Sequence, residues 1–153
     1  MSKSLKTYKY KKTYNSTPSG YPVCIHDTCT MADTCLCRLA YTQINTTDKN
    51  YFRLVNPIQC SKDANCKFYR NSEPVAYARG FKNLQKNMLT GQYRDFMFKL
   101  IGRFGRTGYF ERRRGIIALS PREQQIVLQA LREVGVTEDL KFDAYEENIC
   151  WYD

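Results

Sequence analysis

Two stretches in the second half of the chain carry the hydrophobic periodicity of amphipathic helices. From about Gln92 to Phe104, apolar residues recur at i, i+3, i+4, i+7, i+8 and i+11, on one helix face. Thr90 can cap its start, and Gly105 follows the last periodic residue. The second stretch opens with Ser120-Pro-Arg-Glu123, which supplies an N-cap, a proline at the first helical position and a capping-box glutamate. Gly135 follows its last apolar residue, so the pattern predicts two helices joined by a short basic segment.

Weaker patterns predict three more elements. A helix is expected over about 34–43, with Asp33 as its N-cap, and a second from about Val75 or Gly80 to Asn87. A short strand is expected over 51–55, where aromatic and polar residues alternate loosely.

Changes in composition divide the chain into four segments. Residues 1–20 contain five lysines and almost no aliphatic residues, which predicts a disordered basic tail. A cysteine-rich module follows over 21–72, and a helical domain over 73–136. Residues 137–153 form an acidic, aromatic segment that we expect to cover the core.

Six of the seven cysteines lie between positions 24 and 66. In a reducing compartment such thiols are more often metal ligands or free thiols than disulfides. Four thiolates can surround one zinc ion in a closed, structural site. The spacing predicts one zinc per chain, held by Cys24, Cys29, Cys35 and Cys66. Cys37 or Cys60 could replace one of these, and His26, the only histidine, is an outside candidate.

Two other interpretations of the cysteines stay open, namely small buried hydrophobic residues with free thiols, and an iron–sulfur cluster. Cys35 is expected in the first turn of a helix, where exposed N–H groups favour a thiolate. The predicted fold is therefore mainly α, with a small zinc-stapled cysteine module packed on a multi-helix C-terminal half.

The charge distribution indicates an acidic partner. The chain has a formal net charge of +9, and its basic residues are concentrated at the N-terminus and between Arg79 and Arg114. No apolar run is long enough to span a membrane, and no secretory signal is visible, so a cytoplasmic protein is expected. The chain has no second histidine, no glycine-rich phosphate loop and no hydrolase motif, so we do not expect an enzyme.

Several motifs resemble those of an uncharacterised family of small bacterial proteins. They include Tyr21-Pro-Val-Cys24, Cys66-Lys-Phe-Tyr-Arg70, Phe104-Gly-Arg-Thr-Gly-Tyr-Phe110 and Leu119-Ser-Pro-Arg-Glu-Gln124. The resemblance covers nearly everything after residue 20 and implies no activity. It implies that the four proposed ligands are the matching thiols, while Cys37, Cys60 and Cys150 are additional.

Residues 100–131 also resemble the helix-turn-helix of phage-repressor-type regulators. That resemblance implies a recognition helix over about 107–114, although the interval from Gly105 to Gly115 is about two residues shorter than usual. The expected phosphate or base contacts are Arg103, Arg106, Arg112, Arg113 and Arg114. The other interpretation is a helical hairpin whose arginines are solvated or paired with the acidic C-terminal segment.

Two functions follow from these observations. The first is a small cytoplasmic nucleic-acid-binding protein, such as a regulator, with a structural zinc site. The second is a protein-interaction adaptor with the same zinc site, because tyrosine and tryptophan dominate interface energetics.

Overall fold

The structure, a computed structural model, describes residues 16–44 and 50–152, which form two compact units. The helical unit is Val75–Asn148. The cysteine unit contains the described residues up to Pro74, together with Ile149–Tyr152. The predicted basic tail lies outside the described residues, apart from its last five positions. Each unit has its own buried hydrophobic cluster.

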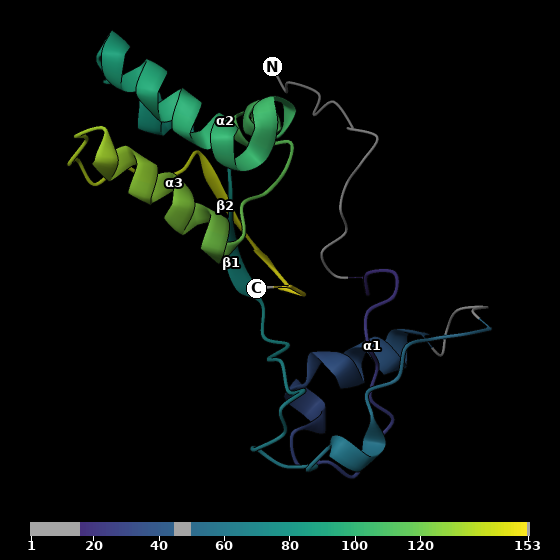
Figure 1. The fold of residues 1–153 in the computed structure, drawn as a ribbon. Coiled ribbons are helices and arrows are strands. Elements are labelled where there is room, and N and C mark those ends of the chain that lie inside the picture. Colours follow the sequence, from purple (N-terminus) through teal and green to yellow (C-terminus); the bar gives the residue numbers. More distant parts are fainter. Residues whose placement is uncertain (1–15, 45–49, 153) are drawn as a thin grey trace, which may run out of the picture. The chain divides into compact units, whose positions relative to one another are not determined.

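Two helices and a two-stranded sheet make up most of the helical unit. Figure 1 shows α2 (Thr90–Arg113) beside α3 (Pro121–Glu133), with the strands β1 (Val75–Arg79) and β2 (Ala144–Asn148) next to them. A 3-10 turn, η3 (Asn83–Gln85), leads from β1 towards α2. The core is built mainly from the apolar faces of these elements: Ala78, Phe81, Leu84, Phe96, Leu100, Tyr109, Leu119, Val127, Ala130, Leu131 and Phe142.

Helix α3 begins as its sequence predicts. The Ser120 hydroxyl accepts the Glu123 N–H at 3.3 Å, and a Glu123 carboxylate oxygen accepts the Ser120 N–H at 3.1 Å. This capping box satisfies two backbone donors that would otherwise lack partners. The predicted start of α2 is shifted by one residue, because Thr90 is the first helical residue and Leu89 is the N-cap.

Helix α2 is broken at Gly105. The backbone there has φ 73° and ψ 165°, a conformation that is open essentially only to glycine. The predicted end of the first helix at Gly105 is therefore confirmed. A second helical segment, 106–113, continues in a new direction and corresponds to the basic segment of the sequence.

The predicted mainly α class is wrong, because the helical unit also contains an antiparallel sheet. Strand β1 pairs with β2 from Val75 with Asn148 to Arg79 with Ala144. The helix predicted from about Val75 or Gly80 to Asn87 does not form: residues 75–79 are strand β1, Gly80 has φ 73°, and only Asn83–Gln85 forms a 3-10 turn. A Cβ at Gly80 would lie 2.5 Å from an Asp143 carboxylate oxygen, and that carboxylate accepts the N–H groups of Lys82 and Asn83. Pairing of β1 with β2, followed by the turn at Gly80, therefore takes the place of the expected helix.

The cysteine unit is built mostly from short turns around one helix. It contains η1 (Ala32–Thr34), α1 (Leu36–Ile44) and η2 (Pro57–Gln59), of which Figure 1 labels α1. The strand predicted over 51–55 is reduced to a single parallel bridge between Val23 and Leu54. The apolar core of this unit consists of Tyr21, Val23, Cys24, Leu36, Cys37, Ala40, Val55 and Trp151. Across the residues that the structure describes, no helix combines the length and apolarity needed to cross a membrane.

Candidate functional site

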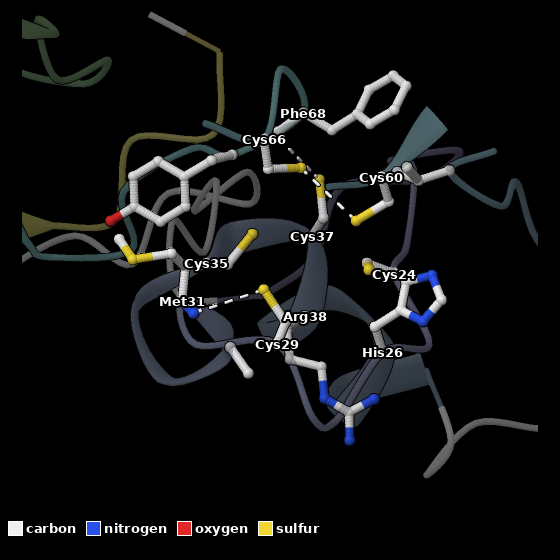
Figure 2. Close-up of a pocket in the computed structure, with 13 residues that line it drawn as sticks. Cys24, His26, Cys29, Met31, Cys35, Cys37, Arg38, Cys60, Cys66 and Phe68 are labelled. Atoms are coloured by element: carbon white, nitrogen blue, oxygen red, sulfur yellow. Dashed lines mark hydrogen bonds between the residues drawn. The ribbon is translucent and has the colours of Figure 1, made fainter. Parts of the chain in front are cut away.

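Six of the seven cysteines line a single cavity of about 20 Å³ in the cysteine unit. That volume is enough for about one water-sized particle. Figure 2 shows the sulfur atoms turned towards a common space, with His26 at its edge. The cysteines are Cys24, Cys29, Cys35, Cys37, Cys60 and Cys66. Only Cys150 lies outside this group.

Backbone hydrogen bonds between distant segments bring these cysteines together. The Cys24 N–H donates to the Cys37 carbonyl at 3.0 Å, and the Leu36 N–H donates to the Arg70 carbonyl at 2.8 Å. These hydrogen bonds tie the start of α1 to the chain before it and to the loop that contains Cys66. The N–H of Met31 donates to the Cys29 sulfur at 3.4 Å.

Cys60 and Cys66 occupy the two ends of a loop with its own hydrogen bonds. The Asp63 carboxylate accepts hydrogen bonds from the Ser61 hydroxyl at 2.7 Å and the Asn65 N–H at 2.9 Å. The Cys66 N–H donates to the Asp63 carbonyl at 3.1 Å. This loop holds the two sulfur atoms 3.6 Å apart.

The thiols differ in acidity. Cys35 directly precedes α1, and hydrogen bonds from the Cys37 thiol and the Arg38 N–H lower its pKa from 9.0 to about 5. The same thiol–thiolate interaction, together with burial, raises the pKa of Cys37. Burial is also the main reason that the pKa of Cys60 is raised to about 11. The thiolate expected at Cys35 from its position at a helix start is therefore favoured here, although α1 begins one residue after it.

The structure does not distinguish the four predicted zinc ligands from the other cysteines of the cavity. In the described part of the chain, no group of three or more His, Cys, Asp or Glu side chains is arranged to hold a metal ion. The zinc-stapled description of the fold is therefore also corrected. Cys24, Cys29, Cys35 and Cys66 share the cavity, but so do Cys37, Cys60 and His26.

The five arginines predicted to contact nucleic acid have different environments. Arg112 and Arg113 are engaged within the helical unit: Arg112 donates to a Glu123 carboxylate oxygen at 2.7 Å, and Arg113 donates to the Gln85 side chain at 2.5 Å. Arg114 and Arg106 are exposed, and both also contact Phe110. The segment therefore does not present its arginines as one recognition face.

Arg103 lies in a different place, on an open groove of about 410 Å³ between α2 and α3. Lys99 precedes it by four residues and therefore lies on the same face of α2. Arg122 contributes from α3. The remaining lining residues are Leu100, Ile126 and Ala130, together with Gln125, Gln129 and Glu133. Lys99 pairs with Glu133 at 2.8 Å, and the groove lining holds three basic residues against this one acid.

The model of a family of unknown function, DUF6078, matches residues 5–151. The chain belongs to this family. No curated protein and no solved structure matches it. The resemblance of this DUF6078 chain to an uncharacterised family is confirmed, while the match gives no support to a helix-turn-helix or to a particular source.

Lys99 and Arg122 of this DUF6078 chain were not predicted as members of a basic groove. The four-residue spacing of Lys99 and Arg103 in the sequence indicates that both side chains lie on one face of a helix. The position of Arg122 beside them depends on how α2 packs against α3, and no local pattern reports that packing.

Proposed function

We propose that this chain is a nucleic-acid-binding protein that contacts phosphate groups through the groove between α2 and α3. The observation that carries the proposal is that Lys99, Arg103 and Arg122 meet at one open groove. Arginine guanidinium groups suit phosphate because they can donate two parallel hydrogen bonds. The net charge of +9 supports the same kind of partner.

A structural zinc ion in the cysteine cavity is the second part of the proposal. The support is that six sulfur atoms and the only histidine line one cavity. All seven cysteines are free thiols, which suits a cytoplasmic location, where thiols stay reduced. A closed zinc site would stabilise a unit whose described residues form a single α-helix.

The groove is tested by reversing the charge of Arg103 and Arg122 together. The double variant R103E/R122E should bind random-sequence DNA and RNA much more weakly than the native chain. Removal of each phosphate interaction should reduce the slope of log affinity against log salt by about 0.9 for duplex DNA. Gel shifts or fluorescence anisotropy at several salt concentrations measure both quantities.

The matched control is K86E/R94E, which makes the same charge change at two exposed positions outside the groove lining. Equal losses of affinity in the two double variants would show that only overall charge matters. Absence of any salt-dependent binding by the native chain would rule out the proposed function.

A protein-interaction adaptor is the second candidate, favoured by apolar side chains on the surface of the cysteine unit. Tyr51 is 91% exposed and Ile58 is 89% exposed, with Phe52 and Leu54 also exposed nearby in sequence. Large exposed apolar residues are typical of interaction surfaces. Salt-insensitive retention of a protein partner, abolished in Y51S/I58S, together with no nucleic-acid binding, would favour this function.

A further inference from the structure

The pair Cys60 and Cys66 has the spacing of two ligands on one zinc ion. Zinc–sulfur bonds of about 2.3 Å in a tetrahedron place neighbouring sulfur atoms about 3.8 Å apart. The two sulfur atoms are 3.6 Å apart. Hydrogen bonds to the Asp63 carboxylate order the loop between them, so the separation is built into the loop.

His26 supplies a second, independent observation. Its Nε2 atom is buried and has no hydrogen-bond partner among the described residues. A buried polar nitrogen without a hydrogen-bond partner destabilises the folded state, so such groups are uncommon in folded proteins. His26 lines the same cavity as the cysteine pair, as Figure 2 shows. Neutral imidazole nitrogen is a common zinc ligand, and ligation would satisfy this atom.

We infer that Cys60, Cys66 and His26 bind one zinc ion together, with a fourth ligand from the remaining cysteines of the cavity. The inference rests on the zinc part of the proposed function and changes its ligand set. Cys60 becomes a principal ligand, and the site contains nitrogen as well as sulfur. Binding requires the thiols of Cys60, Cys66 and the fourth ligand to be deprotonated, with their protons released to the solution, and it requires side-chain rotations that bring the donors onto one ion.

The other interpretation of the pair is two thiols joined by a weak S–H···S contact, with no metal. Metal stoichiometry and affinity separate the two. The native chain, purified without a histidine tag, should contain one zinc ion by mass spectrometry. Competition with a chromophoric chelator should then show that C60S, C66S and H26Q each lose more than the ~100-fold in affinity that removal of an outer-shell partner typically costs.

Cys150→Ser is the matched control, because Cys150 lies outside the cavity. It should keep the native affinity. Native affinity in both C60S and C66S would overturn the ligand assignment while leaving a zinc protein. Absence of zinc binding by the native chain would overturn both the assignment and the zinc part of the proposed function. Neither result depends on the nucleic-acid measurement.

Two measurements on the unmodified chain keep the test independent of whether the variants fold. X-ray absorption at the zinc edge should show a first shell of sulfur and nitrogen, and a shell of sulfur alone would exclude His26. Zinc should protect Cys60 and Cys66 from alkylation by iodoacetamide, whereas Cys150 should react equally with and without the metal. Equal labelling of Cys60 and Cys66 under both conditions would overturn the inference.

Discussion

Arg112 is held within the helical unit by both its charge and its flat guanidinium group. It donates to Glu123 at 2.7 Å and stacks over the Phe104 ring with 4.5 Å between the guanidinium carbon and the ring centroid. Only 17% of its side chain is exposed. Glu123 also caps α3, so this arginine supports the start of that helix.

The first prediction concerns this pair. Arg112→Gln should lower the free energy of unfolding by about 1–3 kcal/mol, because it leaves a partly buried carboxylate without its charged partner. The affinity of the folded variant for nucleic acid should stay close to native. Arg94→Gln is the control, since Arg94 pairs with Asp95 but is 67% exposed, and its loss should cost less than ~1 kcal/mol.

Chemical denaturation measures the stability, and titration under folding conditions measures the binding. A large loss of affinity in Arg112→Gln without a loss of stability would return this residue to the nucleic-acid interface.

At the scale of elements, the break at Gly105 determines what the basic segment can do. Before it, α2 presents Lys99 and Arg103 to the groove. After it, the segment 106–113 turns so that Arg113 reaches Gln85, which in turn donates to the Tyr109 hydroxyl at 2.9 Å. The break therefore separates the cations of the groove from cations that stabilise the unit.

Alanine at Gly105 should destabilise the helical unit by about 1–3 kcal/mol, because an alanine has a steric cost at this backbone conformation. Gly102 provides a matched control in the same helix. Its backbone is helical and a Cβ there would meet nothing within 4 Å, so Gly102→Ala should stabilise the chain by up to ~1 kcal/mol. Thermal or denaturant unfolding of both variants measures the difference, and equal effects would contradict the argument.

At the scale of the whole molecule, the two units have separate hydrophobic clusters. Removal of the proposed zinc ion should therefore act on the cysteine unit and spare the helical unit. Hydrogen–deuterium exchange with and without a chelator should show faster amide exchange in 21–44 and 50–74 and unchanged exchange in 75–148. Uniform acceleration over both units would show that the metal stabilises the chain as one body.

The helices could be predicted from the sequence because their signals are local. The apolar periodicity, the capping box at Ser120 and the glycines at 105 and 135 act over a few residues, and each has the expected role in the structure. The cysteines also lie close together along the chain, and this clustering predicts a site built from thiols.

The strands and the membership of each site depended on tertiary structure. Val75 pairs with Asn148 across more than seventy residues, and no propensity of either segment encodes its partner. Arg122 joins Arg103 only because α3 packs beside α2. His26 and Cys60 line one cavity because backbone hydrogen bonds connect distant segments of the cysteine unit. The local helices, the basic charge and the number of thiols follow from the sequence alone. Only the fold decided which side chains share a surface or a cavity, because those contacts come from packing between distant segments.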